Sequence, residues 1–159
     1  MEGWYLAALK PGKDNIFKAQ MMLERRNIMA FSPLMFSFRP RADRPGQQKK
    51  VIEPLFPGYM FVCFDPEIFH SSKVESCPGI SHLVRFAGTI TPIREAAIEE
   101  VMELPVCVQA FSSERRQRKK HVARAHLSHR QRQQIQALAN EHDGETRSAM
   151  LHAFIDALK

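Results

Sequence analysis

The stretch from residue 114 to residue 140 contains neither glycine nor proline, and this feature most narrows what the C-terminal part of the chain can fold into. The stretch is rich in Arg, Lys, Gln and Ala, which all favour helix. Strands of a β-barrel need alternating β-branched or aromatic residues, but residues 114–143 offer only Val122 and Ile135. The composition therefore predicts helix here and argues against a barrel.

Two further patterns predict a helical hairpin in this part of the chain. Ser128 and Gln131 have the spacing of a capping box, although the sequence leaves open whether they start a new helix or lie within a longer one. A turn is predicted at residues 140–144. The segment 145–158 then places apolar side chains at helical spacing, namely Met150, Leu151, Phe154, Ile155 and Leu158. Such a hairpin cannot bury this stripe by itself.

The first 104 residues alternate between strand-like and helix-like segments that are separated by Pro and Gly turns. Strands are predicted at 4–9, 34–38, 59–64 and 82–86, and helices from Asp14 to about Asn27, at 67–74 and at 92–101. We expect the carboxylate of Asp14 to cap its helix. The basic segment 39–50 predicts an exposed hairpin tip or a mobile loop.

These elements predict an α/β (α+β) sandwich, in which one mixed or antiparallel sheet is covered by helices. We expect a domain over residues 1–104, a linker over residues 105–113 and a C-terminal helical hairpin over residues 114–159. The predicted linker is short, poor in charge and interrupted by Pro105.

The positive charge is concentrated in the C-terminal part. Residues 1–113 hold 13 Lys and Arg against 12 Asp and Glu, whereas residues 114–159 hold 10 against 5. This asymmetry indicates either a polyanionic partner, most often nucleic acid, or a solvated basic helix face without a ligand.

Several protein classes are disfavoured by the sequence. No apolar run approaches the roughly 20 residues of a membrane helix, and the N-terminus does not look like a secretory signal. Cys63, Cys77 and Cys107 are an odd number without a CxxC pair, so we expect a cytoplasmic protein without a disulfide framework. We find no phosphate loop, HExxH or GxSxG motif, and therefore expect no enzymatic activity, cofactor or metal.

Two segments carry a resemblance to a known family. Residues 53–62 read EPLFPGYMFV and residues 79–86 read GISHLVRF. Together with WYL at residues 4–6, Lys10 and LER at residues 23–25, they resemble the N-terminal domain of NusG-type transcription elongation factors. HSS at residues 70–72 and DGETRSAML at residues 143–151 make the match closest to the RfaH branch of that family. The resemblance covers residues 1–104 and resumes near 135–155.

The resemblance implies a factor that binds RNA polymerase and suppresses pausing and termination. The positions that match the site for the clamp helices of the largest subunit are Tyr59, Phe61, Ile98 and Val101. His70, Ser71 and Ser72 match the contact with the gate loop of the second-largest subunit. The positions that match contacts with the non-template DNA strand are Lys10, Lys18, Arg25 and Lys73.

For the C-terminal part, the resemblance implies a helical hairpin that masks the clamp-helix site. The residues that would cover Tyr59 and Phe61 are Leu138, Met150, Leu151, Phe154 and Ile155. Glu53 and Arg147 match an ion pair between the two domains, and we expect the pair to be exposed and worth only about 0.2–1 kcal/mol. Relatives use a β-barrel tail to meet a ribosomal protein, but the composition of 114–143 leaves the barrel and that partner as open predictions.

Two other functions remain compatible with the sequence. One is a basic DNA- or RNA-binding regulator that uses residues 114–132 and needs no polymerase. The other is an adaptor for the ribosome or for a partner protein. In each case we expect a monomer that does not bind membranes.

Overall fold

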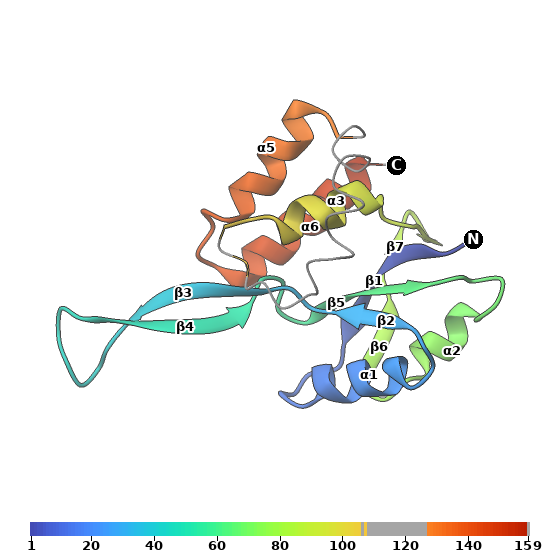
Figure 1. The fold of residues 1–159 in the computed structure, drawn as a ribbon, viewed down its shortest axis with the longest axis horizontal. Helices are drawn as coiled ribbons and strands as arrows, with labels where there is room; N and C mark the ends of the chain where they lie inside the picture. The colour runs from blue at the N-terminus through green and yellow to red at the C-terminus, as the bar shows by residue number, and fades with distance from the viewer. Residues whose placement is uncertain (106, 108–126, 159) are drawn as a thin grey trace.

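The core of the molecule is a four-stranded sheet with the strand order β2-β5-β1-β6 (Figure 1). The computed structural model describes residues 1–105, 107 and 127–158. The sheet consists of β1 (Gly3–Leu9), β2 (Met29–Phe31), β5 (Tyr59–Phe64) and β6 (Ile80–Leu83). Each of its three pairings is antiparallel. The sheet is therefore antiparallel and not mixed, and the fold of the first domain is α+β.

Alternation along the strands gives the sheet two apolar sides. On β5, Met60 and Val62 pack with the buried residues of α1 (Asn15–Glu24) and α2 (Ser71–Glu75), and we call this the α1 side. Phe61, between them, points to the opposite side, where α3 (Glu95–Met102) and the C-terminal helices lie. We call this second side the hairpin side. Figure 1 shows α3, α5 and α6 above the sheet and α1 and α2 below it.

The basic segment forms part of an ordinary β-hairpin that projects from the body of the molecule (Figure 1). Its strands are β3 (Leu34–Pro40) and β4 (Gln48–Pro54), paired from Leu34 opposite Pro54 to Pro40 opposite Gln48. Across the pair, the Lys50 ammonium lies 3.9 Å from the centroid of the Phe36 ring. Of the two alternatives left open by the sequence, the hairpin is the one that forms.

The strands predicted at 4–9 and 59–64 are confirmed, whereas three local predictions need correction. The short helix predicted at 67–74 is limited to Ser71–Glu75. The strand predicted at 82–86 is split into β6 and β7 (Arg85–Phe86), and β7 pairs with the unpredicted β8 (Thr89–Ile90).

The third correction concerns the start of α1. Asp14 precedes the helix, but its side chain makes no capping hydrogen bond. Instead, the amide of Asn15 donates to the carbonyls of Lys10 and Pro11, at 3.1 and 2.7 Å. Gly79 has φ +88°, and a Cβ there would collide with the backbone oxygen of Asn15. The absence of that Cβ lets the first turn of α1 approach the start of β6.

The C-terminal helices are α5 (His129–Leu138) and α6 (Gly144–Ala157). The predicted capping box is confirmed and starts α5: the Ser128 hydroxyl accepts from the Gln131 N–H, and the Gln131 side chain accepts from the Ser128 N–H. The predictions for the linker after residue 107 and for helix at 114–126 fall outside the described residues.

Among the described residues, no helix has the length and apolar character needed to cross a bilayer. Within the same ranges, no three His, Cys, Asp or Glu side chains are grouped so as to hold a metal ion.

Candidate functional site

The four residues that match the clamp-helix site lie together on the hairpin side of the sheet. Tyr59 and Phe61 belong to β5, and Ile98 and Val101 belong to α3. All four take part in one apolar cluster. Phe61, Ile98 and Val101 are only 1%, 4% and 2% exposed, whereas Tyr59 is half-buried. We call these four residues the apolar face.

The helical hairpin completes the cluster that the apolar face begins. Leu138 of α5 and Leu151, Phe154 and Ile155 of α6 are buried in the same cluster, and Met150 packs against it. Leu127, Ile135 and Leu158, which were not among the predicted covering residues, are also buried there. Each such side chain is worth about 1.5–3 kcal/mol when it is fully buried. Apolar burial is therefore the largest favourable contribution to docking of the hairpin.

A direct ring contact joins the hairpin to the apolar face. The imidazole of His152 on α6 meets the Tyr59 ring edge to face, with centroids 4.8 Å apart. The centroid of the Phe86 ring lies 5.9 Å from that of the same imidazole. Helix α6 therefore contacts the Tyr59 ring directly.

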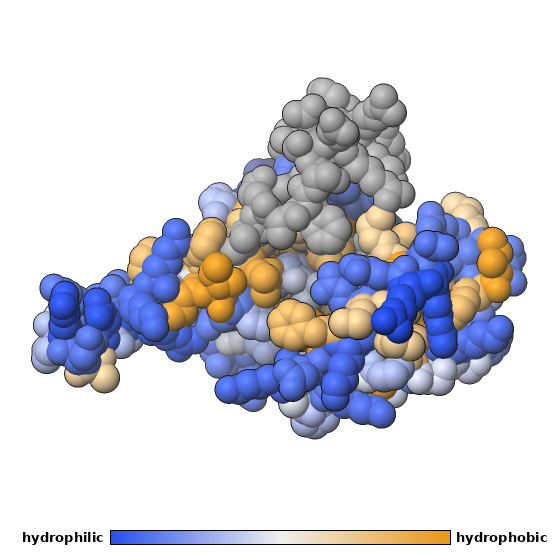
Figure 2. Space-filling model, turned by 60° about the horizontal axis from the view of Figure 1, so that its bottom comes forward, coloured by the Kyte–Doolittle hydropathy of each residue, from blue (hydrophilic) through white to orange (hydrophobic). Residues whose placement is uncertain are grey.

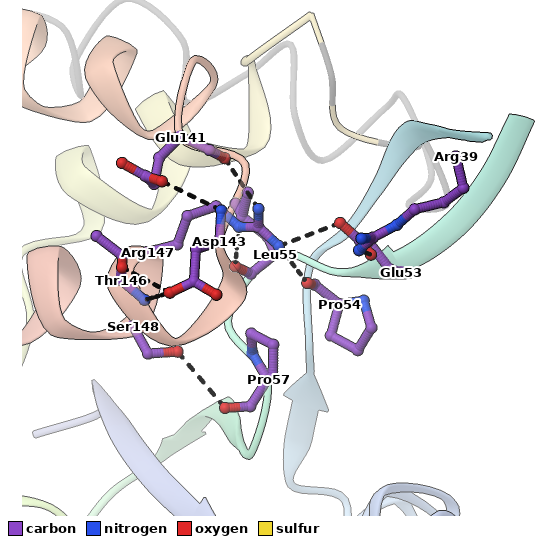
Figure 3. Close-up of polar contacts among 10 residues, drawn as sticks. All are labelled: Arg39, Glu53, Pro54, Leu55, Pro57, Glu141, Asp143, Thr146, Arg147 and Ser148. Carbon is purple, nitrogen blue, oxygen red and sulfur yellow. Dashed lines mark hydrogen bonds and ion pairs between the residues drawn. The ribbon is translucent and has the colours of Figure 1, made fainter. Parts of the chain in front are cut away.

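The Arg147 side chain forms the main polar connection between the hairpin and residues 53–55, at the end of β4 (Figure 3). Its Nε donates to the Leu55 carbonyl at 2.8 Å, and its Nη1 donates to the Glu141 carbonyl at 2.9 Å. Its Nη2 lies 3.3 Å from both the Pro54 carbonyl and Glu53 Oε1. These bonds place one guanidinium between α6, the turn before it and the end of β4.

The predicted ion pair forms, but the expectation that it is exposed is wrong. Arg147 is 1% exposed and is the largest of the fully buried side chains among the described residues. A buried guanidinium must have its donors satisfied, and removing such a charge leaves its partners unpaired and desolvated. The contribution of Arg147 is consequently larger than that of a surface ion pair, and it depends more on backbone carbonyls than on Glu53.

Glu53 is shared between two arginines. Arg39 Nη2 lies 2.6 Å from Glu53 Oε2, while Arg147 binds the other oxygen. Burial by itself would raise the pKa of Glu53, but the hydrogen bond and charge of Arg39, then the charge of Arg147, overcome burial and lower that pKa below 4.5. The ionised form therefore stabilises this contact above about pH 4.5, and the contribution is lost as the pH falls through the lowered pKa.

Helix α6 is capped locally at its N-terminus, and near each end it is hydrogen-bonded to another part of the chain. At its N-terminus, the Asp143 carboxylate accepts from the N–H and the hydroxyl of Thr146, at 3.0 and 2.6 Å. The Ser148 hydroxyl donates to the Pro57 carbonyl at 3.5 Å. At the other end, Arg94 donates to the Leu158 carbonyl at 3.3 Å. The helix is therefore held in one orientation over the sheet.

His152 is a buried ionisable group in this interface whose hydrogen-bonding capacity is not satisfied. Its Nε2 is buried and has no hydrogen-bond partner. Burial lowers the pKa of the imidazole from its ordinary value of 6.5. The docked hairpin therefore favours the neutral ring, and a proton added to it would be partly desolvated near two aromatic rings.

The residues that match the gate-loop contact lie at the start of α2, on the α1 side of the sheet. His70 precedes the helix, and its Nδ1 accepts from the Ser72 N–H at 3.2 Å. His70 and Ser72 are exposed, and Ser71 is half-buried. The structure therefore separates these residues from the apolar face by the thickness of the sheet.

The residues that match DNA contacts are also on the α1 side, and all are exposed. Lys10 follows β1, Lys18 lies on α1 and Arg25 caps its C-terminus. Lys73 of α2 joins this group through Arg26, whose Nη1 lies 3.5 Å from the Lys73 carbonyl. Sequence reasoning missed Arg26, although its position next to Arg25 in a basic pair was a usable signal.

We predict that Arg147 contributes more to hairpin docking than Glu53 does. Arg147→Met should lower the free energy of opening of α6 by about 3 kcal/mol, because carbonyls of Pro54, Leu55 and Glu141 lose their donors. Glu53→Gln should cost about 1 kcal/mol, because Arg147 keeps its carbonyl partners. Hydrogen exchange of the α6 amides measures both values. Equal effects of the two substitutions would show that the ion pair, and not the carbonyls, dominates.

We also predict that acid weakens docking through His152. As the pH falls below 6.5, the undocked imidazole takes up a proton that the docked one resists, so docking loses up to about 1.4 kcal/mol per pH unit. The α6 opening free energy, measured between pH 8 and pH 5, should fall in the native chain and stay nearly constant in His152→Leu. A fall of the same size in His152→Leu would contradict this assignment.

Comparison with known proteins agrees with the family expectation. The model of the family described as "Transcription termination factor nusG" matches residues 2–102, which is more than half of the chain. The chain also resembles a solved structure described as "Domain interaction in Thermotoga maritima NusG", with 23% identity and a TM-score of 0.37. That match covers 65% of this chain and 57% of the other, so the chain spans less than two thirds of that protein's length. On the family match, this chain belongs to the NusG family, whose members are transcription factors and not enzymes.

Proposed function

We propose that this chain is an RNA polymerase-binding elongation and antitermination factor of the RfaH type, in which the hairpin masks the polymerase site. The observation that carries the proposal is the shared apolar cluster, in which Tyr59 and Phe61 are covered by residues of α5 and α6. An apolar face of this kind, with aromatic side chains at its centre, is typical of a surface that receives helices.

The helices that cover the apolar face indicate what kind of partner it can bind. Two helices of the chain itself, α5 and α6, cover this face. A partner that presents a pair of helices, as the clamp helices of the largest polymerase subunit do, would make contacts of the same kind. Because the two occupants would compete for one surface, polymerase can bind only when the hairpin moves away.

The remaining matched residues extend the proposal to the other side of the polymerase cleft and to DNA. His70, Ser71 and Ser72 would contact the gate loop of the second-largest subunit. Binding to the clamp helices and to the gate loop at once would stabilise the closed polymerase against the open, paused form. This is a population shift and not a chemical step. Lys10, Lys18, Arg25 and Lys73 would bind phosphates of the non-template strand.

The balance between the masked and open forms depends on the free energies of apolar burial and of the Arg147 contacts. Apolar burial favours docking, whereas the Arg147 contacts fix the orientation of α6 and adjust the stability of the masked form. The helix-forming composition of residues 128–158 favours a hairpin that docks and leaves as helices. Conversion to a barrel and recruitment of a ribosomal protein are not part of this proposal.

We expect Arg147→Met to strengthen binding of the full chain to purified RNA polymerase. The gain should be about tenfold or more, because each ~1.4 kcal/mol removed from masking changes the apparent affinity by a factor of ten. Adding Tyr59→Ala to this variant should abolish the gain and the suppression of pausing, while affinity for bare DNA stays unchanged. Gln134→Ala, an exposed position on α5, serves as the control and should leave both unchanged.

Two results would contradict the proposal. If Arg147→Met releases α6 but gives no gain in polymerase binding, the hairpin does not mask the site. Another result would be that Tyr59→Ala leaves activity unchanged, while nucleic-acid binding depends steeply on salt through the basic residues at 114–132. The chain would then be a DNA- or RNA-binding regulator that acts without polymerase.

A further inference from the structure

Helix α1 exposes two large apolar side chains that the proposed function does not use. Phe17 is 67% exposed and Met21 is 55% exposed. Because the two are four residues apart, they are neighbours on one face of the helix. The opposite face of α1 is the one that packs on the sheet, through Ala19 and Leu23. Phe17 makes no aromatic or cation–π contact within residues 1–105, 107 and 127–158.

Cations border these two side chains. Lys18 and Arg25 lie three and four residues from Met21, so they flank the same exposed face. Neither forms an ion pair with the described residues. Two carboxylates, Asp14 and Glu24, belong to the same segment, and Glu24 accepts from Gln20 at 3.3 Å.

The basic character continues from the end of α1 onto α2. The Arg26 guanidinium lies 5.5 Å from the centroid of the Phe69 ring, and the Lys73 ammonium lies 5.8 Å from it. Figure 2, which brings the lower side of Figure 1 forward, shows apolar side chains in the middle of this surface with hydrophilic ones around them. The cations would attract phosphates, and they leave the Phe17 ring uncovered.

The chain contains a second exposed phenylalanine, which serves as a comparison. Phe38 on β3 is 62% exposed. The arginines near it are paired with carboxylates, Arg39 with Glu53 at 2.6 Å and Arg41 with Asp43 at 2.8 Å. Lys50, which pairs with Phe38 across the hairpin, holds its ammonium over the Phe36 ring, 3.9 Å from its centroid. Phe38 is therefore an exposed ring whose neighbouring arginines are already paired with carboxylates, whereas Lys18 and Arg25 beside Phe17 are not paired within the described residues.

We propose that Phe17, flanked by Met21, is a stacking platform for an unpaired base of single-stranded DNA. The cations of α1 and α2 bind the phosphates, and the ring then receives the flat face of a base, which every base offers. A duplex hides these faces, so the platform selects unpaired strands. The inference rests on the proposed contact with the non-template strand and adds the residue that recognises its single-stranded state.

The test uses the full chain and two labelled oligonucleotides of about 12 nucleotides. One is oligodeoxythymidine, and the other has the same phosphate backbone with abasic sites in place of the bases. Fluorescence anisotropy at low salt measures both dissociation constants. The native chain should bind the strand with bases about tenfold more tightly than the abasic one.

Phe17→Ala should reduce this ratio to about one, and Phe17→Trp should preserve it. Phe38→Ala, the matched control, should also preserve it. Unchanged thermal unfolding would show that these exposed substitutions leave the fold intact. Lys18→Gln should weaken binding to both strands alike and reduce the salt slope by about 0.7.

The proposal is overturned if Phe17→Ala keeps the preference for bases, if Phe38→Ala loses it equally, or if the native chain does not distinguish the two strands. These results leave the DNA contact itself standing as long as Lys18→Gln weakens binding. If Lys18→Gln and Arg25→Gln change neither affinity, the DNA contact in the proposed function is wrong as well.

Discussion

The orientation of the C-terminal hairpin over the sheet depends on the buried guanidinium of Arg147. Arg147 is almost completely inaccessible and donates to carbonyls of Leu55, Pro54 and Glu141 as well as to the Glu53 carboxylate. Apolar burial alone would hold the hairpin against the sheet in many orientations, because the hydrophobic effect is non-directional. The fixed fork of the guanidinium accepts one geometry, and this selects the orientation in which α6 meets Tyr59.

The sheet distributes different roles to its two sides. Alternation along β5 sends Phe61 to the hairpin side and Met60 to the α1 side. The hairpin side carries the covered apolar surface, and the α1 side carries the open basic surface with Phe17. A one-residue change of register in β5 would exchange the two sides, so the pairing of Tyr5 with Val62 underlies both proposals.

Local features of the fold could be predicted from the sequence, but the features that depend on distant neighbours could not. The run 59–64 and the Ser128–Gln131 capping box contain their own signals, and both are confirmed. The β7–β8 turn was missed because Ala87, at φ 53°, stands where Asn or Gly is the usual signal.

The site residues came from the family resemblance. The burial of Arg147 was not visible in the sequence, because its partner carbonyl at Leu55 is 92 positions away. The open ring of Phe17 was likewise hidden, since the helical pattern alone does not show what covers the outer face.

In the proposed function, the hairpin and RNA polymerase exclude each other from the apolar face. Hydrogen exchange of the full chain, with and without saturating purified polymerase, measures this exclusion. Polymerase should strongly lower the protection of amides in Gly144–Ala157, because an undocked helix of this length is only marginally stable in water, while β5 stays protected. Continued protection of this helix in a stable complex would mean that polymerase binds elsewhere and that the hairpin does not mask its site.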